Sequence, residues 1–186
     1  MYPFVRLLWQ MSRARRAAPL GARDPHVSHH LCLPWDLDGF GELNNGRTLT
    51  LYDLGRFTLG ARIGLIAALR RRRWGLAVAG VSIRYRRRVT VFQRIEMHTR
   101  IVGWDARFFY IVQSMWVKGT CCSEALLRTA VVARGKAVPS GEVAAEMGLP
   151  PESPAMPGWV TAWIEAEGTR PWPPERPPEG PVPSML

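Results

Sequence analysis

The stretch LPWDLDGFGELNNGRTLTLYDLGRF, residues 33–57, joins a loop rich in Asp, Gly and Asn to a long apolar segment. The density of loop-forming residues predicts a loop over residues 34–45, and Asn44 or Asn45 is a favourable helix N-cap. Over residues 48–59 the apolar side chains occupy most of the circumference of a helix. Such a helix is surrounded by other structure, so we expect it to be buried in the domain.

Strands are predicted on both sides of this helix in the sequence. Residues 26–33 have a β-compatible composition, and beyond Gly75 apolar and polar side chains alternate. The connections WDAR and VKGT are short enough for hairpins, so three of the later strands should form an antiparallel meander. These later strands are predicted over residues 76–87, 92–104, 107–119 and 120–133.

The alternation is clearest in the second of the later strands. One face of that strand should carry Ile95, Met97, Thr99 and Ile101, and the other should carry Glu96, His98 and Arg100. A strand of this kind has one face in the core and one face in solvent.

The length of the chain, 186 residues, suits one domain with appendages. Short helices are predicted over residues 63–69, 141–147 and 159–167. The proline content of the C-terminal tail predicts extended or disordered chain. We expect a basic amphipathic segment over residues 1–25, a central domain over 26–135, a helical extension over 136–169 and the Pro-rich tail over 170–186.

The N-terminal segment has two open interpretations. Its apolar run is too short to span a bilayer and is interrupted by Arg6, and its other positive charges follow the run instead of preceding it as in a secretory signal. The segment 1–16 is expected either to lie on a membrane surface or to pack on its own domain or a dimer mate. The residues spaced to share one face are Phe4, Leu7, Leu8 and Met11.

The cysteine content favours a reducing compartment. The chain has three cysteines, Cys32, Cys121 and Cys122, and the last two are adjacent, so a disulfide framework is not expected. We therefore expect a cytoplasmic protein. Peripheral membrane contact through residues 1–16 is the open alternative.

The formal net charge of +10 comes almost wholly from arginine. In a strand, Arg84, Arg86 and Arg88 would share one face and could bind phosphate groups through charge-assisted hydrogen bonds. The competing class is a nucleic-acid binder, in which Trp74 and Tyr85 interleave with the basic residues. No reader motif supports that class, so no nucleic-acid partner is expected.

Other chemistries have little support in the sequence. It contains no Gly-Lys-Ser/Thr phosphate loop and no Gly-x-Ser-x-Gly nucleophile elbow. The potential metal ligands at the first predicted strand and its loop fit no closed zinc pattern, so we expect no metal. The ligand types concerned are His29, His30, Cys32, Asp36 and Asp38.

The segment DLDGFGELNNGRTLTLYDLGRF resembles the signature of the 4-hydroxybenzoyl-CoA thioesterase-like hotdog family. The later segments IRYRRRV and RIVGWDARFFYIVQSMW are similar to the thioesterase superfamily member six-like branch, in which a Gly-Trp-Asp turn joins two strands. The resemblance implies an α+β hotdog fold, in which a curved antiparallel sheet wraps around a long central helix. The signature positions are Asp36, Asp38, Gly41, Leu43, Asn44, Asn45, Tyr52, Asp53 and Arg56.

The resemblance also implies a chemistry. The protein would hydrolyse a thioester of coenzyme A or of an acyl carrier, with Asp38 as the catalytic carboxylate and Asp36 in a turn or capping role. No cofactor is implied, since coenzyme A is part of the substrate. Free N–H groups at the helix start, at Asn44, Asn45 and Gly46, would stabilise the oxyanion. The supporting residues would be Asp36, Gly41, Glu42, Tyr52, Asp53 and Arg56.

Alternatives remain open on the residues alone. Both aspartates could simply hydrogen-bond the loop backbone, as Asx residues in Gly-rich loops do. Glu42 stands where many relatives have His, and the expected Gly-Asp is absent from the strand VFQRIEM. A catalytically silent acyl-CoA or acyl-carrier binding module is therefore the second hypothesis, and a nucleic-acid binder is a distant third. A homodimer or a dimer of dimers is expected, because hotdog relatives pair their sheets across a two-fold axis.

Overall fold

The computed structural model describes residues 2–150 and 152–176. The chain divides into two compact units, the first ending at Met156 and the second beginning at Pro157. In its described residues the second unit contains helix α5 (Gly158–Thr169), close to the predicted range 159–167. The predicted tail falls partly on residues 177–186, which lie outside the described residues.

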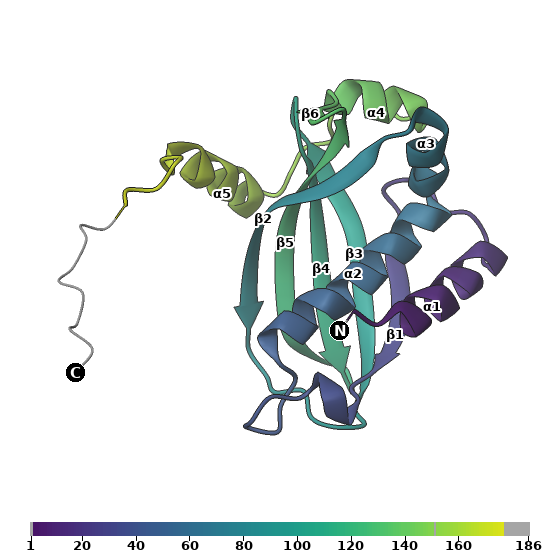
Figure 1. The fold of residues 1–186 in the computed structure, drawn as a ribbon, viewed down its shortest axis with the longest axis vertical. Helices are drawn as coiled ribbons and strands as arrows, with labels where there is room; N and C mark the ends of the chain where they lie inside the picture. The colour runs from purple at the N-terminus through teal and green to yellow at the C-terminus, as the bar shows by residue number, and fades with distance from the viewer. Residues whose placement is uncertain (1, 151, 177–186) are drawn as a thin grey trace, which may run out of the picture. The chain divides into compact units, whose positions relative to one another are not determined.

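The first unit contains a curled antiparallel sheet. Its strands follow the order β1-β3-β4-β5-β2, and β6 pairs with β5 (Figure 1). The predicted meander is confirmed, since β3, β4 and β5 are neighbours in the sheet. The strands are β1 (His26–Leu31), β2 (Gly75–Tyr85), β3 (Arg94–Trp104), β4 (Phe109–Val117), β5 (Thr120–Ala133) and β6 (Lys136–Ala137).

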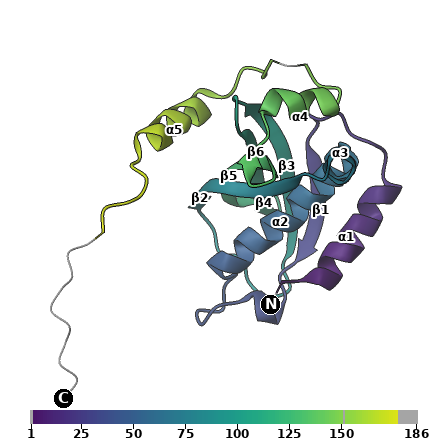
Figure 2. The same ribbon diagram turned by 45° about the horizontal axis from the view of Figure 1, so that its top comes forward.

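Helix α2 (Asn45–Arg62) lies in the concave face of the sheet, which curls around it (Figure 2). This is the α+β hotdog arrangement expected from the sequence. Around α2 lie helices α1 (Phe4–Arg16), α3 (Leu65–Arg72) and α4 (Ser140–Glu146), with a short 3-10 helix η1 (Pro34–Asp36) before it. The start of α3 differs from the predicted residue 63, because Gly64 adopts a left-handed conformation that separates it from α2.

Close packing of α2 on β3 depends on a glycine. A Cβ atom at Gly55 would lie 2.5 Å from Met97 Sδ and 2.8 Å from Thr99 Oγ1, so a larger residue would force these side chains or the helix to shift. On either side of the glycine, Leu51 and Leu54 are fully buried. The predicted alternation of β3 is confirmed up to Ile101, after which a bulge leaves several consecutive residues buried.

Helix α1 protects one edge of the sheet. The side chains of Arg6 and Gln10 donate hydrogen bonds of 2.7 and 2.8 Å to the carbonyl groups of Leu31 and His29 in β1. These bonds satisfy acceptors that an edge strand would otherwise leave open. Within the described ranges, no helix has the length and apolar character needed to cross a membrane.

The predicted apolar face of the N-terminal segment is wrong. Leu7 packs against the core, whereas Phe4 and Leu8 are exposed. The outer face of α1 carries Val5, Leu8 and Trp9 instead. The cause is that Arg6 and Gln10, one turn apart, both bind β1 and fix the rotation of the helix about its axis.

Candidate functional site

A hollow of about 470 Å³ opens at the N-terminal end of α2. The loop before α2, the first turn of α2 and the segment after β2 form its walls. Its lining includes five predicted site residues, Asp38, Glu42, Asn45, Arg86 and Arg88, together with Arg87. The structure therefore brings acidic, amide and basic groups to one opening.

Asp38 is held in an Asx turn at the rim of this hollow. Its Oδ1 accepts a hydrogen bond of 2.8 Å from the amide of Phe40 and a longer one of 3.4 Å from the amide of Glu42. Gly41, in a left-handed conformation, allows the chain to turn back within this short loop. In the described part of the chain, Oδ2 accepts no hydrogen bond, so one oxygen of Asp38 is available to a ligand.

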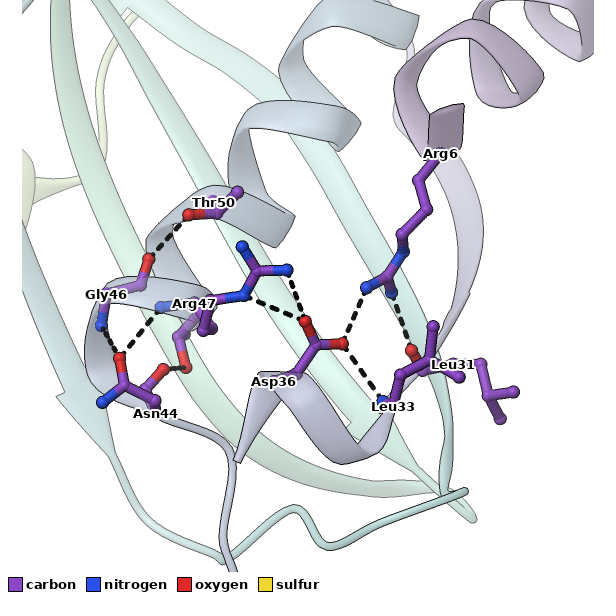
Figure 3. Close-up of polar contacts among 9 residues, drawn as sticks. Arg6, Leu31, Leu33, Asp36, Asn44, Gly46, Arg47 and Thr50 are labelled. Carbon is purple, nitrogen blue, oxygen red and sulfur yellow. Dashed lines mark hydrogen bonds and ion pairs between the residues drawn. The ribbon is translucent and has the colours of Figure 1, made fainter. Parts of the chain in front are cut away.

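Asp36 has a different environment, shown in Figure 3. Its carboxylate is fully buried and pairs with Arg6 at 2.7 Å and with Arg47 at 2.6 Å, and it also accepts a hydrogen bond from the Leu33 amide. Burial alone would raise the pKa of Asp36, but the hydrogen bonds from Arg47 and Arg6 outweigh burial and leave the pKa below its ordinary value. With both oxygens occupied, Asp36 connects η1 to α1 and α2.

The N-terminus of α2 offers one open backbone donor. Asn44 is the N-cap, as the sequence predicts, and its Oδ1 accepts hydrogen bonds from the amides of Gly46 and Arg47 at 2.9 and 3.3 Å (Figure 3). The predicted donor at Gly46 is therefore occupied by the cap. The predicted donor at Asn44 is also occupied, since its amide donates to the carbonyl of Asp36 at 2.9 Å. Among the residues that the structure describes, the Asn45 amide has no hydrogen-bond partner, and Asn45 lines the hollow.

The predicted arginine patch forms on a different structural basis. Strand β2 ends at Tyr85, so Arg86 and Arg88 lie in the following loop and do not share a strand face with Arg84, which is absent from the lining of the hollow. The strand ends here because the amides of Arg86 and Arg87 both turn to the carbonyl of Cys122. The loop thereby brings three consecutive arginines, Arg86 to Arg88, to the hollow.

Glu42 is paired within the same hollow. Its carboxylate lies 3.4 Å from Nε of Arg88, and both side chains are partly exposed. An exposed pair of this kind contributes little to stability, so a ligand can displace it at low cost.

The supporting residues of α2 form two separate sets. Tyr52 is buried and its hydroxyl lies 2.9 Å from Ser123 Oγ, and Ser123 lines the hollow. Burial raises the pKa of Tyr52 above its ordinary value, so this phenol stays neutral. Asp53 and Arg56 form an ion pair three residues apart, outside the lining of the hollow.

Several residues that line the hollow are missing from the sequence-based set of site residues. Ser123 and Arg87 are two of them: Ser123 lies outside the quoted motifs, and Arg87 lies within IRYRRRV but is not among the predicted site residues. The available signal for Ser123 was its place in the predicted strand 120–133, where the period of two puts it on the same face of β5 as Ala125. Arg87 was assigned to the opposite face because the strand was expected to continue through it.

The sequence is similar to known proteins of one family. The family model described as the thioesterase-like superfamily matches residues 32–164. Protein THEM6 of Danio rerio is 38% identical over 113 residues, which cover 59% of this chain and 55% of that protein. Protein THEM6 of Xenopus laevis is 31% identical over 140 residues, which cover 75% of this chain and 67% of that protein. The match thus spans only about half the length of the first of these relatives.

Solved structures show the same fold. A probable thioesterase, YbaW of Escherichia coli, has a TM-score of 0.61 at 16% identity and covers 65% of this chain and 95% of its own. A 1,4-dihydroxy-2-naphthoyl-CoA thioesterase from Synechocystis has a TM-score of 0.58 at 13% identity, covering 67% and 95%. From the extent of the family match, this chain belongs to the thioesterase-like superfamily.

Proposed function

We propose that the protein hydrolyses a thioester of coenzyme A or of an acyl carrier, with Asp38 as the catalytic carboxylate. The observation that carries this proposal is that Asp38 and Asn45 line the same hollow. Within the described residues, neither Asp38 Oδ2 nor the Asn45 amide has a hydrogen-bond partner in the protein. A carboxylate can act as nucleophile or general base in thioester hydrolysis, and an N–H donor can stabilise the negative charge that develops on the carbonyl oxygen.

The reaction follows from these two groups. The thioester carbonyl carbon would lie next to Asp38, and its oxygen would accept a hydrogen bond from the Asn45 amide at the positive end of α2. Asp38 would remove a proton from an attacking water, so that the C–S bond breaks and the carboxylic acid and coenzyme A leave. Alternatively, Asp38 would attack the carbon directly and expel the thiolate, and water would then hydrolyse the resulting mixed anhydride to release the acid and regenerate Asp38.

The basic loop supplies the recognition of coenzyme A in this proposal. Arg86 and Arg87 flank the hollow, and their guanidinium groups suit phosphate oxygens. Arg88 would exchange its partner Glu42 for a phosphate group when substrate binds.

A homodimer is part of the same proposal. Strand β2 is the other edge of the sheet, and nearly all its side chains are exposed. The exposed residues include Leu76, Val78 and Val81, which would be buried if β2 paired with its copy across a two-fold axis. Tyr85, at the end of β2, lines the hollow, so a partner subunit seated here would narrow it.

A catalytically silent acyl-CoA binding module is the second candidate. It is favoured by the hydrogen bonds that Asp38 Oδ1 accepts from the loop backbone, which are those of an ordinary Asx turn. Both candidates predict binding of acyl-CoA, and only the first predicts turnover.

The deciding experiment is a thioesterase assay across short, long and aromatic acyl-CoA substrates, with Asp38→Asn as the comparison. We expect turnover to fall by a factor on the order of 100 or more in Asp38→Asn, while acyl-CoA still raises the melting temperature. Wild-type protein that is inactive on every substrate but stabilised by acyl-CoA would favour the silent module. No effect of acyl-CoA, with a salt-sensitive complex with RNA or DNA, would contradict both.

A further inference from the structure

The outer face of α1 is apolar in its first two turns. Val5, Leu8 and Trp9 are 82%, 70% and 53% exposed, and their spacing puts them on one side of the helix. The opposite side of the helix is held to β1 and α2. The exposed side chains therefore form a ridge on a helix whose orientation is already fixed.

Positive charge follows this ridge. The last turn of α1 contains Arg13, Arg15 and Arg16, and the helix contains no acidic residue. The guanidinium carbon of Arg13 lies 4.8 Å from the centre of the Trp9 ring, so the basic and apolar parts of the helix are in direct contact.

A second hollow, of about 330 Å³, opens beside this last turn, between α1, β1 and α2. Arg13, Arg16 and Arg62 line it, and among the described residues its lining includes no carboxylate. It is separate from the hollow at Asp38, with which it shares no lining residue. An opening with three guanidinium groups and no acidic group suits an anion.

The floor of this basic hollow is polar and fixed. His26 Nδ1 accepts a hydrogen bond of 3.1 Å from Arg62, and its Nε2 lies 2.9 Å from Thr58 Oγ1. Since the Thr58 hydroxyl donates to backbone carbonyls of its own helix, His26 must donate through Nε2 and is therefore neutral. Arg62 also donates two bonds to the carbonyl of Ala18, which fixes its position at the wall.

We propose that α1 lies on an anionic membrane surface, with Val5, Leu8 and Trp9 in the interfacial layer and the basic hollow receiving the phosphate of a lipid headgroup. The apolar ridge alone could bind another protein, and the basic hollow alone could bind a soluble anion. The apolar ridge and the basic hollow touch each other where Arg13 stacks on Trp9. A lipid surface has the same arrangement, because its apolar chains lie directly beneath a layer of phosphate groups. This inference does not depend on the proposed hydrolysis.

The experiment is flotation of the full chain with vesicles of phosphatidylcholine alone or mixed with phosphatidylglycerol. We expect binding to the mixed vesicles, weaker binding to phosphatidylcholine, and loss of binding at high salt. The triple variant Val5→Ser, Leu8→Ser, Trp9→Ser should bind the mixed vesicles at least on the order of tenfold more weakly than the wild type. The variant Arg13→Gln, Arg16→Gln should lose about fivefold per arginine.

Matched controls test whether the loss of charge or of an apolar side chain elsewhere on the protein also weakens vesicle binding. Arg94→Gln with Arg100→Gln removes the same charge from the exposed face of β3, and Phe92→Ser removes an exposed aromatic residue elsewhere. We expect the controls to bind as the wild type does. All the substituted side chains are exposed, so melting temperatures should be unchanged. If the triple variant melts lower, Leu8→Gln alone replaces it.

Three results would overturn the proposal. The first is equal binding by the wild type and both α1 variants. The second is stabilisation by inorganic phosphate without binding to vesicles, which would identify the basic hollow as a site for a soluble anion. The third is a change of oligomeric state in the triple variant without vesicle binding by the wild type, which would identify the ridge as a contact between copies of the chain.

Discussion

The guanidinium group of Arg47 lies 2.6 Å from the buried carboxylate of Asp36, and this ion pair joins the loop that contains Asp38 to the first turn of α2. Arg6 of α1 binds the other oxygen of the same carboxylate. The two aspartates of the loop thus have different environments, since Asp36 is buried in ion pairs and Asp38 lines the hollow.

We therefore expect Asp36→Asn to act on stability. The substitution leaves Arg6 and Arg47 without their anionic partner, and breaking a buried ion pair costs about 3–5 kcal/mol. Urea unfolding measures this loss of free energy. Asp38→Asn serves as the comparison and should unfold within about 1 kcal/mol of the wild type, because Asn keeps the turn-forming oxygen. Equal losses of unfolding free energy in the two variants would contradict a stabilising role that belongs to Asp36 and not to Asp38.

The packing of α2 makes a prediction about two glycines of one helix. Gly55→Ala should lower the free energy of unfolding by about 1–3 kcal/mol, because its methyl group meets Met97 and Thr99. Gly60→Ala is the matched control, since its methyl group would find its nearest neighbour at 3.5 Å. There the higher helix propensity of Ala should prevail, with a gain of up to about 1 kcal/mol. Chemical denaturation of both variants checks the opposite signs.

Two buried histidines predict a loss of stability in mild acid. Burial, assisted by the nearby arginines Arg62 and Arg6, lowers the pKa of His26 from 6.5 to about 4 and that of His30 from 6.5 to about 3. Below pH 6.5 the unfolded chain therefore binds protons that the folded chain does not, and the free energy of unfolding falls as the pH falls towards 4. The slope is at most about 1.4 kcal/mol per pH unit for each histidine.

Urea unfolding at a series of pH values from about 7.5 to about 4.5, on either side of the ordinary histidine pKa, measures this slope. His26→Gln should make the slope shallower, because it removes one of the two buried histidines. Asp36 titrates at lower pH, because its pKa is below the ordinary carboxyl value, so its loss falls outside this window. A free energy that stays constant down to pH 4.5 would contradict the neutral state of both histidines.

The edge strand β2 makes a prediction about assembly. We expect a dimer in sedimentation at micromolar concentration, and Val78→Lys with Val81→Lys should dissociate it, because charge on an edge strand opposes pairing. Val91→Lys, at another exposed position, is the control and should leave the dimer intact. A monomeric wild-type protein would exclude pairing through β2.

Local patterns in the sequence were sufficient for most of the fold. The alternation at Ile95, Met97 and Thr99 determines which face of β3 is buried, and Asn44 caps α2 through atoms only two and three residues away. Contacts between distant residues could not be predicted in the same way. Asp36 is buried because Arg6, thirty residues earlier, reaches it. The rotation of α1 likewise depends on its bonds to β1, so the apolar spacing of α1 alone gave the wrong face.

The arginine patch shows a different limit. Alternation grouped Arg84, Arg86 and Arg88, but two backbone amides bind the Cys122 carbonyl and end the strand before Arg86. A strand end set by one neighbouring carbonyl leaves no trace in the spacing of the side chains, so Arg87 could not be expected at the hollow.

The hydrogen bonds from Arg6 and Gln10 to β1 also limit how the protein can aggregate. An incoming strand at this edge would have to displace two side chains that already saturate the carbonyls of Leu31 and His29. Strand pairing is therefore blocked at the β1 edge of the sheet and open at the β2 edge. Two copies joined through their open margins would leave only blocked margins, so growth into a filament would stop at two.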